Sequence, residues 1–432
     1  MGSRRRRACG ASRNHATMRT ILTVSVENFL SFRKSEVKLG SLNVLVGPNG
    51  AGKTNFLKIF QFLGDVARLD LIPAIDGLGG FRELRFRGRK PTNAKDVRLI
   101  LRGMMTEHAD ENTPDEYDLA CREDRGFVHE SSGGQLADQA RFIRTETIRF
   151  NRGTGPGRQI TLQGRCATFA TVDPSGQSAG QKGLHLSVQP QSAGLNTIRK
   201  LGDEYDAPDI EALAQVLENF RLFDVNVAKI RQPASRTSTP SLASDGSNVV
   251  HFLLTLERDY PAIFERLCDD IQFVLPGFEE FRFHRVGGAD DATRLAIKER
   301  HINGDTPLAR ASFGTIRAIA LFAMLHDPNP PRITCIEEID HGFHPHALDR
   351  VVERVREASE RTQIIVATHS PALVNRLEPG ELIIFERDAN TGATRIVELD
   401  PAQAGKMEDE SGYRMGELWF SGILGGGLGQ EA

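Results

Sequence analysis

The distribution of apolar and polar residues predicts a chain in which strands and helices alternate. Near the N-terminus, Thr20–Val26 alternates apolar and polar positions, as a half-buried strand does, and Glu36–Leu39 begins a second strand. The largely apolar run Leu42–Val46 is typical of a strand that is buried on both faces. Asn55–Leu63 then repeats apolar residues at helical spacing, so a helix is predicted shortly after the buried strand.

The last third of the chain repeats this alternation. Apolar runs predict strands at Arg332–Glu338, Gln363–Thr368 and Glu381–Phe385. Helical spacing of apolar residues predicts helices at Ile316–Ala323 and Ala347–Ala358. Strands that alternate with helices favour an α/β fold with a mainly parallel sheet.

The middle of the chain has a different pattern. From about Gly103 to Gly183 the sequence is polar, rich in glycine and weakly periodic, which favours loops, with a short strand signal at 140–150. Helical patterns return at 210–220, 249–254 and 261–273. No heptad pattern is sustained, so a long coiled-coil arm is not expected. His251 and His284 stand singly in apolar surroundings, and we interpret both as packing residues.

The connection between the buried strand and its helix carries the clearest chemistry. It reads Gly47-Pro48-Asn49-Gly50-Ala51-Gly52-Lys53-Thr54 and matches G-x-x-x-x-G-K-T in full. In such a loop, backbone N–H groups and a helix N-terminus surround a polyphosphate. Lys53 would reach the β- and γ-phosphates, and the Thr54 hydroxyl would hold Mg²⁺. A chance glycine-rich loop is the alternative, but the strand and the helix on either side speak against it.

Two later strands end in side chains that suit nucleotide hydrolysis. Glu337 and Glu338 end one strand, where α/β sheets place their ligands. One carboxylate can join the Mg²⁺ shell while its neighbour orients or deprotonates the attacking water. His369 follows the next strand and is placed to reach a γ-phosphate.

Three further features allow two interpretations each. Ser312 precedes a helix and is a good N-cap, which needs no function. Asp340 with His341, His344 and His346 could form a metal cluster, but the start of a helix explains this stretch better. Arg82–Lys90 mixes aromatic residues with arginines and could follow a nucleic-acid backbone. We favour an amphipathic strand with a solvated basic face for this last stretch.

Composition narrows the class of protein. The 432 residues are 39% hydrophobic and 26% charged, which fits a soluble globular protein of several domains, and the net charge of −3 gives no general attraction to nucleic acid. The five cysteines are scattered without a C-x-x-C pair, which suits a reducing cytoplasm. No apolar run is long enough to span a membrane.

The N-terminus begins with a basic run whose role stays open. Arg4–Arg7 is followed by polar residues, not by the apolar segment of a secretory signal. We interpret residues 1–17 as a disordered basic tail or as sequence upstream of a start at Met18. A basic arm that binds nucleic acid is the other interpretation.

The order of these features resembles ABC-type ATPase heads, and more closely the RecF/SMC-like AAA_21 group of bacterial ATPases. This group includes the ATPase parts of OLD-family nucleases and of several phage-defence systems. The resemblance runs from Met18 to the C-terminus and is strongest at Asn28–Phe32, Gly47–Thr54, Asp245–Asn248, Ile336–Pro345 and Ala367–Pro371. Ala311-Ser312-Phe313-Gly314-Thr315 departs from L-S-G-G-Q, which speaks against a transporter subunit. We identify no Q-loop glutamine, and too few residues follow His369 for a fused TOPRIM nuclease.

The resemblance implies a role for each matching residue. Lys53 and Thr54 resemble Walker A residues, Glu337 the Walker B acid that holds Mg²⁺, and Glu338 the catalytic glutamate. Ser312 and Gly314 occupy the signature, which in such heads binds the γ-phosphate of the partner subunit. His369 is similar to the switch histidine, and Asp340–Pro345 is similar to the D-loop.

The resemblance also implies an architecture and a function. We expect a P-loop ATPase head of the ABC type, with a mixed or parallel sheet flanked by helices, formed by residues 18–102 and 295–432 around an inserted, loop-rich and then helical region, 103–294. It would bind ATP and Mg²⁺, form a head-to-tail homodimer around two ATP molecules and hydrolyse them slowly in the cytoplasm. The output would be a signal to DNA, or to a separate nuclease or toxin effector, in DNA repair or phage defence. The alternatives are a nucleotide-gated interaction module with little turnover and the ATP-binding subunit of a transporter.

Overall fold

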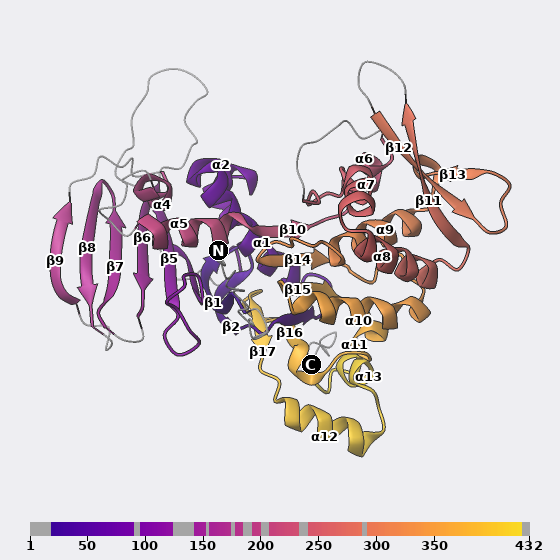
Figure 1. Ribbon diagram of the computed structural model, residues 1–432. Coiled ribbons are helices and arrows are strands. Elements are labelled where there is room, and N and C mark those ends of the chain that lie inside the picture. Colours follow the sequence, from indigo (N-terminus) through magenta and orange to yellow (C-terminus); the bar gives the residue numbers. More distant parts are fainter. Residues whose placement is uncertain are drawn as a thin grey trace, which may run out of the picture.

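The computed structural model describes residues 19–89, 96–123, 142–152, 155–173, 178–184, 192–199, 207–232, 241–286 and 292–425. The basic tail predicted at residues 1–17 lies outside these residues. Two large sheets and one long helix, α1 (Lys53–Leu69), organise the chain, with a three-stranded sheet and several helices at the opposite end from β9 (Figure 1).

A six-stranded sheet forms the centre of the molecule. Its order is β10-β14-β15-β3-β16-β17, and every neighbouring pair is parallel except β16 with β17. The strands are β3 (Leu42–Val46), β10 (Phe220–Phe223), β14 (Ile333–Glu337), β15 (Gln363–Thr368), β16 (Leu382–Arg387) and β17 (Thr394–Val397). Every residue of β3 and of β15 is buried, as expected for strands covered on both faces.

The two faces of this central sheet belong to different hydrophobic cores. Leu45 on β3 packs into a core with α1, whereas its neighbours Val44 and Val46 pack into the second core on the opposite face. Because successive side chains of a strand point to opposite faces, one short strand joins both cores. This arrangement fixes the phosphate loop, which follows β3 directly.

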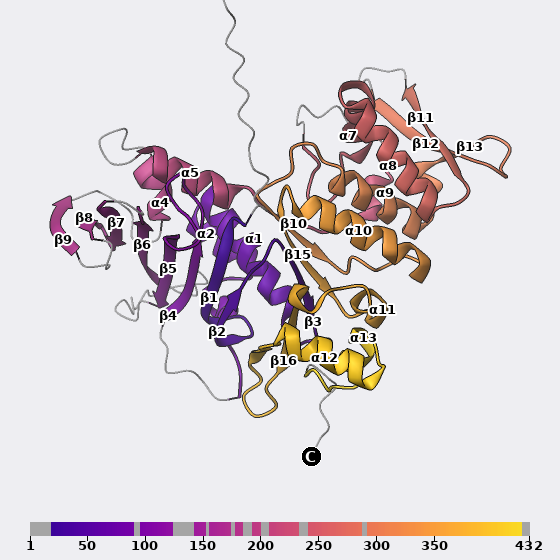
Figure 2. The same cartoon turned by 60° about the horizontal axis from the view of Figure 1, so that its bottom comes forward.

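The first core is covered by an eight-stranded antiparallel sheet with the order β2-β1-β4-β5-β6-β7-β8-β9. Its strands are β1 (Ile21–Phe29), β2 (Phe32–Lys38), β4 (Asp96–Gly103), β5 (Asp115–Glu123), β6 (Phe142–Phe150), β7 (Gly157–Gln163), β8 (Cys166–Val172) and β9 (Ser178–Leu184). The helices α2 (Leu71–Gly77), α4 (Gly194–Ile198) and α5 (Ala207–Glu218) complete this side (Figure 2).

The sequence favours loops for most of residues 103–183, but the structure has five strands there, β5 to β9. These strands are only seven to nine residues long, and Gly164 forms the turn between β7 and β8. Short alternating segments between turns give a weak periodic signal. Pairing of β5 with β4 supplies stabilisation that the strand propensity of the local sequence does not give. The residues that we assigned to an insertion therefore continue the sheet that β1 begins, and the domain boundaries stay a prediction.

Helices cover the other face of the central sheet. They are α6 (Val227–Ile230), α7 (Val249–Asp259), α8 (Pro261–Val274), α9 (Phe313–Leu325), α10 (Leu348–Ser359) and α11 (Pro371–Val374). The three-stranded sheet packs outside them, with β11 (Phe278–Val286), β12 (Ala292–Glu299) and β13 (Asp305–Pro307). The chain ends with α12 (Pro401–Ser411) and α13 (Met415–Phe420).

Buried Asp270 ties α8 to two of these helices. Its carboxylate lies 2.6 Å from Nε2 of His326, next to the end of α9, and accepts a 2.7 Å hydrogen bond from Nε of Arg354 on α10. Burial alone would raise the pKa of Asp270, but these two partners favour the charged form and leave its pKa below the ordinary range. The Asp270 carboxylate thus joins α8 to the end of α9 and to α10.

The basic stretch 82–90 differs from its prediction. Phe81–Leu84 forms a short helix, α3, because Phe81 and Leu84 are both buried and stand three residues apart, at helical spacing. Arg87 pairs with Glu83 one turn earlier, so an acid offsets part of the basic character. Lys90 lies outside the described residues.

The two histidines that the sequence analysis interpreted as packing residues differ in their exposure. His284 on β11 keeps 56% of its side chain exposed and lies 3.4 Å from Asp305, so the packing interpretation is wrong for it. His251 lies on α7 and is half-buried. In the part of the chain that the structure describes, no helix has the length and apolar character needed to cross a membrane.

Candidate nucleotide-binding site

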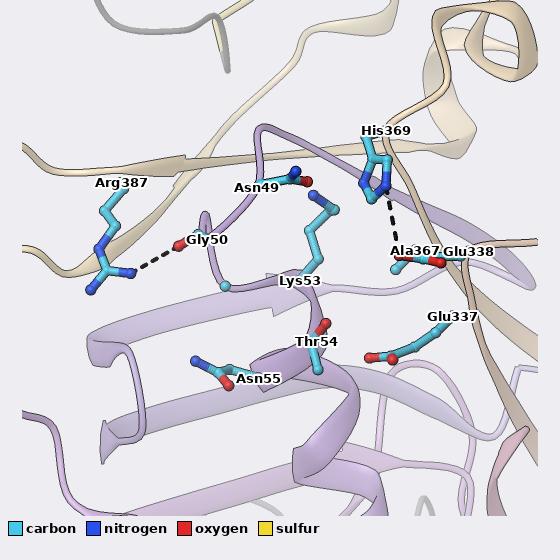
Figure 3. A pocket seen from close by; sticks show the side chains of 11 residues that line it. Asn49, Gly50, Lys53, Thr54, Asn55, Glu337, Glu338, Ala367, His369 and Arg387 are labelled. Carbon is cyan, nitrogen blue, oxygen red and sulfur yellow. Dashed lines mark hydrogen bonds and ion pairs between the residues drawn. The ribbon is translucent and has the colours of Figure 1, made fainter. Parts of the chain in front are cut away.

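A cleft of about 400 Å³ opens at the carboxyl ends of four neighbouring strands, β14, β15, β3 and β16 (Figure 3). Parallel strands bring these ends to one edge of the sheet, where α/β folds bind their ligands. The cleft is lined by Asn49, Gly50, Gly52, Lys53, Thr54, Asn55, Glu337, Glu338, Ala367, His369 and Arg387. Most of the side chains that the sequence singled out for phosphate chemistry therefore meet in one place.

The phosphate loop needs glycine at position 52 for two reasons. Gly52 has φ of 109°, and a Cβ atom there would lie 2.0 Å from Oγ1 of Thr394. Gly52 is also the N-cap residue of α1 and, having no side chain, cannot cap the helix itself. The first N–H groups of α1 are thus left for an anion at the helix N-terminus.

Lys53 reaches across the loop from the first position of α1. Its Nζ donates to the carbonyl oxygens of Gly47 at 2.6 Å and of Pro48 at 3.1 Å, which uses two of its three N–H donors. Burial lowers the pKa of Lys53 to about 8, and the negative charges of Glu338 and Glu337 oppose this shift. A polyphosphate in the cleft would supply the counter-charge that this buried ammonium group favours.

Glu337 has the features of a metal ligand. Its Oε1 atom is buried and has no hydrogen-bond partner among the described residues, although a buried carboxylate oxygen normally has one. The Thr54 hydroxyl lines the same cleft. Carboxylate and hydroxyl oxygens are the donors that Mg²⁺ prefers, so Thr54 and Glu337 could hold this ion together with phosphate oxygens.

Glu338 is held in an uncommon backbone conformation. Its φ is 47°, a left-handed value that few residues other than glycine adopt, and it directly follows β14. The N–H of Glu338 donates to the Ala367 carbonyl at 2.9 Å. Arg317 on α9 donates to the carbonyl of Glu338 at 3.1 Å. These contacts turn the chain so that the Glu338 carboxylate lies in the cleft, half exposed, beside the half-buried Glu337.

His369 lies on the opposite wall of the cleft from Glu337 (Figure 3). It follows buried Thr368 at the end of β15, and its Nε2 is 3.8 Å from Oε1 of Glu338. Thr368 donates through its hydroxyl to Asp340, and Ser370 caps α11, so both neighbours of His369 are fixed. The histidine can therefore contact a ligand that approaches Glu338.

The far end of the cleft contains residues that sequence reasoning missed. Arg387 at the end of β16 donates to the Gly50 carbonyl at 2.9 Å. Asn55 donates to the Ser31 hydroxyl at 2.9 Å, and the hydroxyl oxygen of buried Thr394 lies 2.7 Å from that of Ser31 and 2.8 Å from the Ala51 carbonyl oxygen. The turn between β1 and β2 and the strand β17 thus hold the loop from outside. Asn55 follows the loop directly in the sequence, whereas strand order brings Arg387, Thr394 and Ser31 to the loop, and no local pattern reveals that.

Ser312 and Gly314 are not among the residues that line this cleft. Ser312 is the N-cap of α9, as predicted, and accepts a 3.0 Å hydrogen bond from the N–H of Thr315. A Cβ atom on Gly314 would lie 2.7 Å from the Gly342 carbonyl, so the start of α9 packs directly against the segment after Glu338. The ring of Phe313 is 44% exposed and lies 5.3 Å from that of His341.

A second cleft continues from the metal side of the first one. Thr54 and Glu337 line both, and the second also contains Gln61 on α1 and Asp224, the residue after β10. The described residues include no group of three or more His, Cys, Asp or Glu side chains placed to hold a metal. The metal-cluster interpretation of His341, His344 and His346 therefore gains no support from the structure.

The sequence matches the family described as "AAA domain, putative AbiEii toxin, Type IV TA system" (AAA_21) over residues 42–113 and 199–375, which is more than half of the chain. The chain belongs to the AAA_21 family. Both matched segments contain site residues, the phosphate loop in the first and Glu337, Glu338 and His369 in the second. A comparison with curated proteins finds no match.

Solved structures show the same fold for this AAA_21 chain. One is the SmcHead bound to the C-winged helix domain of ScpA, with a TM-score of 0.52 and 15% identity, covering 90% of this chain and 99% of that one. Another is the Smc head domain with an extended coiled coil bound to the C-terminal domain of ScpA from Pyrococcus furiosus, with a TM-score of 0.51 and 15% identity, covering 92% and 100%. These two structures confirm the predicted P-loop NTPase fold.

Proposed function

We propose that this AAA_21 protein binds and hydrolyses ATP with Mg²⁺. The observation that carries the proposal is the meeting of Lys53, Thr54, Glu337, Glu338 and His369 in one cleft. These side chains come from three neighbouring strand ends and supply what phosphoryl transfer requires, which is positioning and stabilisation of charge.

Each side chain has a part in the proposed reaction. The loop amides and Lys53 hold the β- and γ-phosphates, while Thr54 and Glu337 hold Mg²⁺. An ion held by these two residues would supply positive charge that offsets the charge of the phosphates. Glu338 accepts a proton from the attacking water, or orients it, and His369 contacts the γ-phosphate from the other side.

We further propose that two copies close head to tail, so that Ser312 and Gly314 of one chain complete the site of the other. Support comes from their position outside the cleft of their own chain and from the exposed Phe313 between them. A nucleotide-dependent dimer would pass a signal to DNA or to a partner effector in repair or phage defence, in the cytoplasm. The similar Smc heads bound to domains of ScpA support a protein partner.

The direct test is steady-state phosphate release by the wild type and by Glu338→Gln. The amide is nearly isosteric but cannot take a proton from water, so the rate should fall on the order of 10²-fold or more while ATP stays bound. Light scattering should then show an ATP-dependent dimer. The control Glu353→Gln changes an exposed carboxylate on α10 outside the cleft and should behave as the wild type.

Three results would contradict all or part of this proposal. Normal phosphate release by Glu338→Gln would remove the catalytic role of this residue. Tight ATP binding with no release above background by the wild type would instead favour the nucleotide-gated interaction module. Recovery of the protein in the membrane fraction together with a permease would favour a transporter subunit.

A mixing experiment tests the shared site. Lys53→Ala cannot hold the phosphates, and Ser312→Arg blocks the facing signature, so each homodimer should be inactive. In the mixed dimer, one site takes intact Lys53 from the second chain and intact Ser312 from the first, so part of the activity should return.

If Ser312 acts only as an N-cap in its own chain, every site of the mixture contains a damaged protomer and nothing returns. Differential tags must confirm that the heterodimer forms. Single-site ATP trapping on this heterodimer separates a failed shared site from a requirement that both sites act together.

A further inference from the structure

The strand order gives the cleft a direction. Glu337 ends β14 and Glu338 follows it, His369 follows β15, and Lys53 begins the helix α1 after the loop that follows β3. The groups for the metal and the γ-phosphate therefore all lie at β3 or on its β15 side. The other neighbour of β3 is β16, which ends in Arg387. A nucleoside triphosphate whose γ-phosphate meets Glu338 would direct its nucleoside toward Arg387 if it crosses the phosphate loop, because Arg387 lines the cleft on the opposite side of β3 from the two acids.

Arg387 is placed to contact a ligand there. One guanidinium N–H donates to the Gly50 carbonyl at 2.9 Å, while the side chain is exposed and lines the cleft (Figure 3). The guanidinium group has five N–H donors, so this contact anchors it and leaves most of its donors for a ligand, and the exposed side chain can present a flat face as well. Gly50 itself has φ of 78° and carries no Cβ that could obstruct the approach.

The composition of this end indicates what the ligand contacts. Among the described residues that line the cleft, none is Phe, Tyr or Trp, so no aromatic ring of this chain is available there to stack on a base. The planar guanidinium group is the one large flat surface at this end within the described lining, and guanidinium groups stack on aromatic faces.

We propose that Arg387 forms the nucleoside end of the site by stacking on the base. The proposal rests on the nucleotide-binding function proposed above. Stacking recognises the face of a ring, which every base has, so Arg387 adds affinity for nucleoside triphosphates without selecting adenine over guanine. The hydrogen bond to Gly50 couples this contact to the phosphate loop and pre-organises the side chain.

The test compares ligands with and without a nucleoside. Dissociation constants for ATP, GTP and inorganic tripolyphosphate, each with Mg²⁺, are measured by calorimetry for the wild type and for Arg387→Ala. The variant should bind ATP and GTP about tenfold more weakly, as expected for loss of one cation–π contact, and tripolyphosphate within about twofold of the wild type. Arg395→Ala removes an arginine from the neighbouring strand β17 outside this cleft and should change none of the three.

Other outcomes separate this inference from the function on which it rests. If Arg387→Ala weakens tripolyphosphate as much as ATP, Arg387 only braces the phosphate loop or contacts phosphate, and the inference is wrong. Unchanged binding of all three ligands also overturns it. Loss of ATP binding but not GTP binding would show an edge contact with adenine instead of stacking. If wild-type protein binds neither ATP nor tripolyphosphate, the proposed function fails first.

Discussion

The two large sheets use charged residues in opposite ways. In the parallel sheet, the charged groups stand at strand ends and face a common cleft, where Glu338 and His369 stay about half exposed. In the antiparallel sheet, charges pair across neighbouring strands, as Arg98 does with Asp118 at 2.9 and 2.6 Å. Parallel strands bring all their carboxyl ends to one edge, whereas antiparallel strands alternate direction and place side chains opposite one another along their length. The first arrangement collects groups for a ligand, and the second satisfies them internally.

The antiparallel sheet even keeps an ion pair inside its core. Arg144 and Glu146 on β6 are both fully buried, with Nη1 and Oε2 3.6 Å apart. Glu146 also accepts hydrogen bonds from the Tyr117 hydroxyl and the Leu195 N–H, each at 3.0 Å. Burial raises the pKa of Glu146, although Arg144 and these two donors oppose the shift. This pair holds α4 to the sheet, away from the cleft, so it should affect stability and not catalysis.

The largest expected effect is the loss of Lys53 in the parallel sheet. Lys53→Ala removes the preorganised positive charge at the γ-phosphate and should lower kcat/KM for ATP on the order of 10²–10³-fold. Its thermal midpoint should stay close to that of the wild type or rise, since a buried ammonium group with a lowered pKa is removed. A turnover rate equal to that of the wild type would show that the cleft is not the catalytic site. The charged groups at these strand ends would then not act on a ligand.

The second effect concerns the antiparallel sheet, where a substitution should lower stability and leave hydrolysis nearly unchanged. Glu146→Ala leaves Arg144 buried without its counter-charge and should lower the free energy of unfolding by about 3 kcal/mol, measured by urea denaturation. The rate of ATP hydrolysis per folded molecule should change less than about twofold.

Two variants sharpen this second prediction. Replacing both Arg144 and Glu146 by leucine should restore most of the stability, because apolar residues can replace a buried ion pair. Arg98→Ala breaks a half-exposed pair in the same sheet and should cost less than about 1 kcal/mol. A loss of hydrolysis in the double leucine variant at full stability would show that the antiparallel sheet takes part in catalysis.

The smallest effect is the response of ATP affinity to pH. Because burial lowers the pKa of Lys53 to about 8, the free protein loses this proton above pH 8, and a bound polyphosphate would restore it. Affinity should therefore be constant below pH 8 and fall above it, by about tenfold between pH 7 and pH 9. Calorimetry in buffers of different ionisation enthalpy should show proton uptake on binding near pH 8.5. Lys53→Arg keeps its charge over this range, so its affinity should not vary with pH in this way.

The sequence alone determined much of the chemistry and the elements that carry it. The motif Gly47–Thr54 connects β3 to the start of α1 as predicted, and Glu337, Glu338 and His369 lie at the ends of strands that the apolar runs had indicated. These predictions succeeded because a phosphate loop, a buried strand and a helix are each encoded by residues close together in the chain. The family match and the similar Smc heads agree with the P-loop fold expected from them.

Strand order and the antiparallel sheet were decided by tertiary structure. No local pattern shows that β16 lies beside β3, so the sequence could not place Arg387 at the cleft, nor Thr394 against Gly52. The weak alternation of residues 103–183 became five strands because each could pair with the strand before it. Pairing and burial between distant segments contribute more to such short strands than their own propensity does. The sequence thus determined which groups could act on a nucleotide, and only the folded sheet decided which other residues would surround it.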